Sequence, residues 1–260
     1  MEFLEAIILG IVQGLTEFLP VSSSGHLEII KHVFGKDKSG EENLVMTVVL
    51  HFATALSTIF VFRKDINTIF KKTVKKEKDE INFIIFIICS MIPAIIVGFV
   101  FESKIKTLFE LKGLVFVGMM LIITAALLLL ADKAKKSDKS LNIKNSLIIG
   151  IAQALAIFPG ISRSGATIST SVLLGIDKEK AAKFSFLMVV PLIIGKILYD
   201  LIFEIESLLS ANLTILLIGF LSSFLTGLIS CKLMIYFVKK SKLKYFSLYC
   251  IIVALFCIFI

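Results

Sequence analysis

Long uninterrupted runs of apolar residues constrain the fold of this 260-residue chain more than any other feature. A helix needs about 20 predominantly apolar residues to cross the hydrocarbon core of a bilayer. Hydrophobic residues make up 57% of the chain, and six runs approach or exceed that length. These runs cover residues 44–62, 81–101, 113–131, 184–203, 213–238 and 244–260. We therefore expect an all-α integral membrane protein with six transmembrane helices.

The net charge of +8 does not predict binding to nucleic acid. The lysines cluster in short loops between the apolar runs, where cationic residues set the orientation of a membrane protein. The cysteines have no CxxC spacing and lie inside apolar runs, as weakly polar packing residues do; they are Cys89, Cys231, Cys250 and Cys257. We therefore expect membrane lipid, and no nucleic acid, as a partner.

A repeat with an offset of 140 residues organises the chain. Residues 10–25 read GIVQGLTEFLPVSSSG and residues 150–165 read GIAQALAIFPGISRSG, so eight of these sixteen positions are identical. Gln, two Ser and two Gly are among the identical residues, which a shared apolar composition does not explain. We therefore predict a single membrane domain, 1–260, made of two repeats at about 1–131 and 141–260.

Each repeat begins with a helix that is too short to span a membrane. The helices expected at 5–19 and 145–158 are about 15 residues, or roughly 22 Å, long, whereas the hydrocarbon core is about 30 Å thick. Both end at tips rich in Pro, Ser and Gly, at 20–25 and 159–165. Non-helical backbone at membrane depth must be buried in protein or line a wet cavity. We predict two re-entrant helical hairpins; a full span followed by a surface loop is the alternative.

Three spans follow each hairpin, and this odd number inverts the second repeat relative to the first. Inverted repeats with broken helices place their binding sites near the membrane midplane. The loops at 63–80, 132–144, 176–183 and 239–244 carry 19 Lys and Arg, against 6 in the loops at 31–43, 102–112 and 204–212. Because cytoplasmic loops are the cation-rich ones, we expect a site between the tips that opens toward the outer side.

The first tip gathers the polar groups that a reaction would need. Gln13 and Glu17 lie four residues apart and share one helix face, and a carboxylate among apolar residues is costly without a partner. The residues that follow are Ser22, Ser23, Ser24, Gly25 and His26. Hydroxyls and an imidazole suit nucleophilic and acid–base chemistry. The N-terminus of the helix that follows is suited to binding an anion. One serine can instead be only the N-cap of that helix. His32 and His51 are expected to be structural.

The second tip carries Arg163, one of only two arginines in the chain. A guanidinium flanked by hydroxyls suits a bidentate grip on phosphate; the alternative is an arginine that extends to the membrane surface. Ser162, Ser164 and Thr167 lie beside it. At the repeat offset, Ser23 aligns with Arg163 and Glu17 with Ile157. The tips thus differ at chemical residues and agree at turn residues, as one asymmetric site built from two tips would require.

These motifs resemble the two signatures of the bacterial undecaprenyl-diphosphate phosphatase family, which is linked to bacitracin resistance. The resemblance is carried by Gln13-xxx-Glu17, by Pro20 to His26 and by the run PGISRSGAT at 159–167, and it extends over the whole chain in length and motif spacing. It implies a hydrolase of the plasma membrane that removes the terminal phosphate from undecaprenyl diphosphate. This reaction recycles the lipid carrier for peptidoglycan synthesis.

The resemblance also implies roles for individual residues. It makes Glu17, Ser23, His26 and Arg163 catalytic, and it implies a divalent cation, Mg²⁺ or Ca²⁺. Glu17 either binds this cation through hard oxygen ligands or orients His26. Ser22, Ser162 and Thr167 also match functional positions of the family, and we expect them to bind substrate together with Gln13, Ser24, Gly25 and Ser164 of the same motifs. The family pattern allows Glu or Gln at position 13, and the Gln form here weakens any metal role there.

Three questions stay open at this point. The nucleophile is either Ser23 or a water activated by His26 or Glu17. The rival function is a polyprenyl-phosphate flippase or transporter, because inverted repeats with broken helices are typical of transporters. The oligomeric state is not determined, and a homodimer is one alternative.

Overall fold

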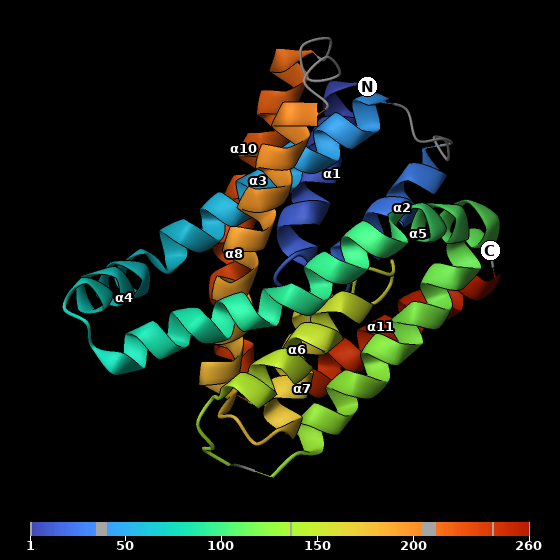
Figure 1. Cartoon of the computed structure of the whole chain (residues 1–260). Helices are drawn as coiled ribbons and strands as arrows, with labels where there is room; N and C mark the ends of the chain where they lie inside the picture. Colours follow the sequence, from blue (N-terminus) through green and yellow to red (C-terminus); the bar gives the residue numbers. More distant parts are fainter. Residues whose placement is uncertain (1, 35–40, 136, 204–211, 241, 260) are drawn as a thin grey trace.

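The computed structural model describes residues 2–34, 41–135, 137–203, 212–240 and 242–259. The first half of the chain contains α1 (Phe3–Thr16), α2 (Ser23–Val33), α3 (Glu41–Val61), α4 (Arg63–Val74) and α5 (Lys78–Lys133). The second half contains α6 (Ile143–Leu155), α7 (Arg163–Leu173), α8 (Lys178–Phe203), α10 (Leu213–Lys239) and α11 (Leu243–Phe259). Because the described residues contain no strand, the predicted all-α class is confirmed (Figure 1).

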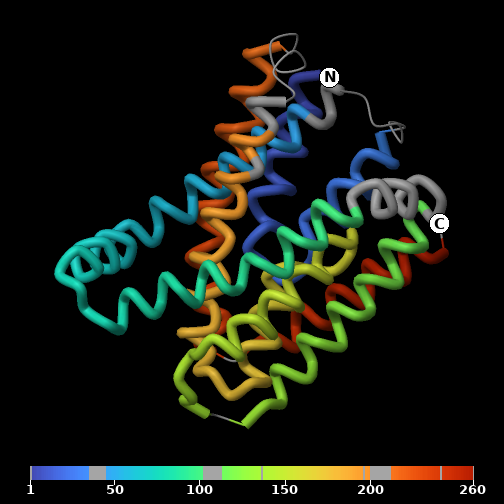
Figure 2. Tube along the Cα trace, in the orientation of Figure 1, coloured from blue at the N-terminus to red at the C-terminus, as the bar shows by residue number. Residues whose placement is uncertain are grey.

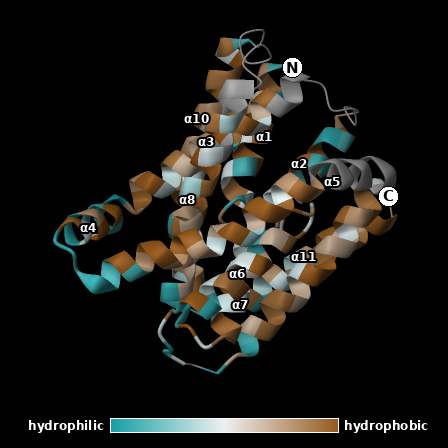
Figure 3. Ribbon diagram, in the orientation of Figure 1, coloured by the Kyte–Doolittle hydropathy of each residue, from teal (hydrophilic) through white to brown (hydrophobic). Residues whose placement is uncertain are grey.

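Several helices are long and apolar enough to cross a membrane. Among the described residues, four segments qualify alone: Lys78–Phe101, Gly113–Lys133, Lys178–Tyr199 and Leu213–Lys239. A fifth candidate is the pair Val45–Val61 and Arg63–Val74, bent by 70°. Apolar residues run along α5 and α11, whereas hydrophilic residues concentrate near α4 and in the connection between α5 and α6 (Figure 3). This distribution, together with the four or five candidate spans, indicates a multi-pass membrane protein.

Two segments that the sequence predicted as loops are helical. Residues 102–112 continue α5, and the break falls at Gly113, whose φ of 49° is open to glycine at little cost. The segment contains Lys, Leu and Glu, which favour helix, and no Pro or Gly before Gly113. Residues 63–74 of the expected cation-rich loop form α4. The expected loops at 31–43 and 204–212 contain residues 35–40 and 204–211, which lie outside the described residues.

The helix that begins each half packs against a helix of the other half. α1 contacts α10, and α6 contacts α5. Glycine allows both approaches: a Cβ on Gly10 would lie 2.6 Å from the carbonyl oxygen of Gly219, and one on Gly150 would lie 2.4 Å from that of Ser90. These two glycines are aligned at the repeat offset of 140 residues. The second segment of α5 and α11 also run side by side (Figure 2).

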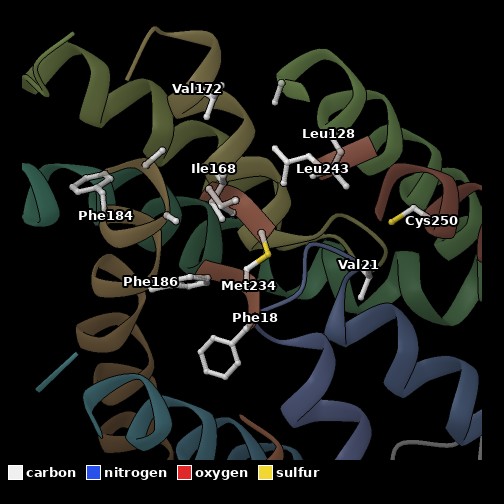
Figure 4. Close-up of a cluster of buried hydrophobic side chains, with 14 of the residues drawn as sticks. Phe18, Val21, Leu128, Ile168, Val172, Phe184, Phe186, Met234, Leu243 and Cys250 are labelled. Atoms are coloured by element: carbon white, nitrogen blue, oxygen red, sulfur yellow. The ribbon is translucent and has the colours of Figure 1, made fainter. Parts of the chain in front are cut away.

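Both tips are held inside the core of the molecule. Phe18 and Val21 of the first tip belong to the same buried cluster as Ile168 and Val172 of α7 (Figure 4). The ring of Phe18 packs edge-on against Phe186 of α8, with centroids 5.7 Å apart. This packing brings the polar residues of both tips to the interior, where they require partners.

Candidate functional site

The two tips contact each other directly. The amide of Gly160 donates to Ser22 Oγ at 3.1 Å, and Ser164 Oγ donates to the carbonyl of Leu19 at 3.3 Å. Each tip also receives support from the last helix of the opposite half. Thr124 Oγ1 of α5 lies 2.8 Å from the Gly160 carbonyl, and Cys250 Sγ of α11 lies 3.6 Å from the Pro20 carbonyl. The tips are therefore fixed relative to one another by backbone contacts.

Serine side chains cap the helix that leaves each tip. Ser22 Oγ accepts from the Gly25 amide at 3.3 Å at the start of α2, and Ser162 Oγ accepts from the Gly165 amide at 3.1 Å at the start of α7. The N-cap alternative given for the first tip therefore holds for Ser22, and Ser162 caps α7 in the same way; both satisfy amides that the helix leaves free. Ser22 adopts φ 71°, a conformation that is strained for a residue with a side chain. Ser23 Oγ caps neither helix and donates instead to Glu17.

Glu17 lies at the centre of the contact between the tips. Its carboxylate accepts from Arg163 Nη2 on one oxygen and from Ser23 Oγ, at 2.7 Å, on the other. Gln13 Nε2 donates to that second oxygen at 3.0 Å. Glu17 is only 6% exposed, and a buried carboxylate is tolerated when a cation and hydrogen-bond donors surround it. The partner that the sequence required for Glu17 is therefore Arg163, contributed by the other tip.

A cavity of about 250 Å³ opens beside this ion pair. Its polar wall contains residues of α1, of both tips, of α3 and of α6: Thr16, Glu17, Ser22, Ser23, Ser24, His51, Gln153, Ser162 and Arg163. Its apolar wall comes largely from α5, α8 and the segment that follows α6: Ala94, Ala156, Ile157, Ile161, Val189, Leu192 and Ile193. The cavity thus offers a cation and hydroxyls on one side and hydrocarbon on the other, as an amphiphilic ligand with an anionic head requires.

The remaining predicted residues support the wall from behind. Gln13 reaches the site only through Glu17. Thr167 Oγ1 donates to the Arg163 carbonyl at 2.8 Å and lies 2.6 Å from Ser185 Oγ. Ser164 joins the tips, and Gly25 binds the Ser22 cap. None of these four residues lines the cavity in the described structure.

The structure does not bring His26 to the cavity. Its Nδ1 lies 2.8 Å from the Ser22 carbonyl, one turn earlier, and this contact directs Nε2 toward α11. There Nε2 lies 2.8 Å from Tyr249 Oη, and the two rings stack with centroids 5.6 Å apart. Sequence proximity to the three serines suggested a shared site, but the contact with α11 turns the imidazole away from it.

His51, which the sequence analysis treated as structural, lines the cavity instead. Its Nδ1 lies 2.8 Å from the Thr47 carbonyl, so Nδ1 carries the proton and Nε2 faces the site. Nε2 lies 3.9 Å from Glu17 Oε2. The available signal was an ionisable residue in the middle of an apolar run, which is itself a functional indication in a membrane protein.

The residues at the cavity do not fit a protein-built site for a divalent cation. No group of three His, Cys, Asp or Glu side chains suitable for a metal occurs among the described residues. Glu17 is the one carboxylate in the described cavity wall, and Arg163, Ser23 and Gln13 occupy its oxygens. A hard cation prefers several oxygen ligands, which this wall by itself does not supply.

Comparisons with known proteins agree over nearly the whole chain. The family described as "Bacitracin resistance protein BacA" matches residues 6–256. A protein of Christiangramia forsetii named undecaprenyl-diphosphatase is 57% identical over 256 residues, which cover 98% of this chain and 97% of that protein. Proteins of the same name from Bacteroides fragilis and Methanococcus vannielii are 48% and 41% identical. Those two alignments cover 97% and 98% of this chain, and 96% and 99% of the relatives.

Proposed function

Because the chain belongs to the bacitracin resistance protein BacA family, we propose that it is an integral membrane phosphatase that hydrolyses undecaprenyl diphosphate to undecaprenyl phosphate and phosphate. This reaction returns the lipid carrier to cell-wall synthesis and confers bacitracin resistance. One observation carries the proposal beyond the family: Ser23 and Arg163, from different tips, meet on the carboxylate of Glu17 at the wall of a single cavity.

The two walls of the cavity suit the two ends of this substrate. The terminal phosphoryl group lies at the polar wall, where Arg163 offers the guanidinium N–H groups that Glu17 does not use. The first carbons of the prenyl chain lie against the apolar wall, which includes Val189 and Leu192 of α8. Phosphoryl transfer depends mainly on positioning the reacting groups and on neutralising their charge. The ion pair between the tips holds the guanidinium of Arg163 where it can do both.

We assign the attack to Ser23. Its Oγ bonds to the terminal phosphorus, the bond from that phosphorus to the bridging oxygen breaks, and undecaprenyl phosphate leaves. The hydroxyl proton passes to Glu17, to which Ser23 already donates at 2.7 Å. Water then attacks the phosphorus of the phosphoserine and passes a proton to His51 Nε2, the bond from phosphorus to Ser23 Oγ breaks, and Ser23 recovers a proton from Glu17. Inorganic phosphate leaves, and His51 returns its proton to the phosphate or to solvent. Direct attack by water is the alternative, and it leaves no phosphoserine.

A requirement for Mg²⁺ or Ca²⁺ stays a proposal drawn from the family resemblance. Any such ion would take most of its oxygen ligands from the diphosphate, since Glu17 is already paired with Arg163. The reaction steps assigned to this chain therefore use its own side chains alone.

We also propose six spans and two re-entrant hairpins in an inverted repeat. In this arrangement α1 with α2 and α6 with α7 form the hairpins, α5 contributes two spans, and α11, with 17 residues, completes the set. The short lengths of α1 and α6 and the packing of each on the opposite half support it. The cation bias of the loops orients the site toward the outer side of the plasma membrane. A homodimer and a monomer are both compatible with this arrangement.

Release of inorganic phosphate by the purified protein in detergent tests the function. C55 and C15 prenyl diphosphates serve as substrates, each with and without EDTA. We expect release from both substrates, and the EDTA arm shows whether a divalent cation is needed. No release under any condition, combined with movement of labelled polyprenyl phosphate across vesicles that contain the protein, would identify a flippase instead.

A further inference from the structure

Gln153 of α6 combines complete burial with a lack of hydrogen-bond partners. It is 2% exposed, and neither its Nε2 nor its Oε1 has a partner among the described residues. A buried carboxamide without partners is unfavourable. Such groups in a native protein call for an explanation, and the location of this one supplies it.

Gln153 lies on the wall of the proposed catalytic cavity. It lines the same cavity as Ser23, Arg163 and His51. The wall residues that follow it in the chain are Ala156 and Ile157, just after the end of α6, and they have no polar side-chain atoms. The unpaired donor and acceptor are enclosed and belong to a side chain that borders the cavity.

The corresponding residue of the other repeat shows what is missing. Gln13 aligns with Gln153 at the offset of 140 residues, and its Nε2 donates to Glu17, four residues later. The residue four after Gln153 is Ile157, which cannot accept a hydrogen bond. The same side chain thus has an internal anionic partner in the first half and none in the second, so the partner of Gln153 has to come from the ligand.

We propose that Gln153 binds the terminal phosphoryl group of the substrate. Nε2 donates to a non-bridging oxygen, and Oε1 accepts from the attacking water or from a protonated phosphate oxygen. This inference rests on the proposed phosphatase function and adds a substrate contact on α6, outside both tips. A neutral carboxamide suits the position because Arg163 already supplies the cation.

Two substitutions and a control test this contact. Gln153→Met keeps the length of the side chain and removes its hydrogen bonds, so kcat/KM for C15 diphosphate should fall about tenfold. Gln153→Glu should lose more, because a carboxylate repels the phosphate. Both variants should also weaken inhibition by inorganic phosphate, which reports binding without turnover. Ser169→Ala is the matched control, since Ser169 Oγ is likewise buried without a described partner but lies outside the cavity wall.

The results for Gln153→Met either support or contradict the contact between Gln153 and the phosphoryl group. Wild-type kcat/KM and phosphate inhibition in Gln153→Met would overturn the contact. A lower melting temperature of Gln153→Met without ligand would also overturn it, because it would reveal an internal partner for the amide. An inactive wild-type protein would contradict the proposed function itself, whereas an active wild type with an unaffected Gln153→Met contradicts only this inference.

Discussion

In the proposed mechanism Arg163 has two roles, because it pairs with Glu17 and also lines the cavity, where its remaining N–H groups would bind the phosphate. Arg163→Lys keeps the charge but loses the planar fork that binds two oxygens at once. We expect turnover to fall by about tenfold or more in a protein that still folds. Arg163→Ala should in addition lower the melting temperature, because it leaves a buried carboxylate without its cation. Near-normal phosphate release by both variants would rule out the phosphate clamp.

The two histidines near the site should respond differently to substitution. His51→Gln removes the imidazole that faces the cavity, so phosphate release should fall about tenfold or more with little change in melting temperature. His26→Ala removes the contacts to Ser22 and Tyr249 that hold the first tip. It should therefore lower activity and melting temperature together. Full activity of His51→Gln would exclude His51 from proton transfer, and loss of activity without loss of stability in His26→Ala would restore His26 to that role.

Single residues were predictable where their chemistry was unusual for their surroundings. The meeting of Glu17 and Arg163, 146 residues apart in the chain, could be anticipated, because each was a charge in an apolar setting without a nearby partner. The absence of His26 from the described cavity wall and the presence of His51 in it could not, since Tyr249 is 223 residues from His26 in the chain and His51 reaches Glu17 from another helix. The sequence shows that Gln153 is one of the identical positions of the two repeats. A function is indicated only by the folded chain, in which the carboxamide of Gln153 has no described hydrogen-bond partner.

At the level of helices, the contact of α6 with α5 depends on one small residue. A Cβ at Gly150 would lie 2.4 Å from the Ser90 carbonyl, which is backbone and cannot move aside cheaply. Gly150→Ala should therefore destabilise the protein by about 1–3 kcal/mol, measured as a lower melting temperature in detergent. Gly98→Ala on α5 is the control, because nothing lies within 4 Å of its added Cβ and alanine favours helix by up to about 1 kcal/mol. Equal melting temperatures for the two variants would contradict this packing.

The sequence predicted the positions of the helices more accurately than the positions of the connections between them. Apolar run length and the Ser-rich tips predicted the helices near 5–19 and 145–158, which the structure places at Phe3–Thr16 and Ile143–Leu155. The continuation of α5 through 102–112 and the presence of α4 were missed. Charge had indicated loops there, whereas backbone preference and the position of Gly113 determine where the helix breaks.

The orientation of the whole molecule can be tested by labelling. The cation bias of the loops predicts that α4 lies at the cytoplasmic side and the start of α10 at the outer side. A membrane-impermeant thiol reagent added to intact cells should therefore label Leu213→Cys and spare Lys75→Cys. The background carries Ala at Cys89, Cys231 and Cys257 and Ser at Cys250, whose Sγ contacts the first tip. The reverse pattern would invert the protein and open the site to the cytoplasm.

In the proposed site, residues from both halves of the chain act on one phosphate, and a double-mutant comparison tests this arrangement most directly. Phosphate release from undecaprenyl diphosphate is measured for the wild type, Ser23→Ala, Arg163→Ala and the double variant, with Ser24→Ala as the milder control. Residues that act as a unit are strongly non-additive. We expect each single variant to lose nearly all activity and the double variant to lose little more. A wild-type protein that releases no phosphate would contradict this arrangement, as would a Ser23→Ala variant that keeps more than about a tenth of the wild-type rate, a loss of under roughly 1.4 kcal/mol in barrier.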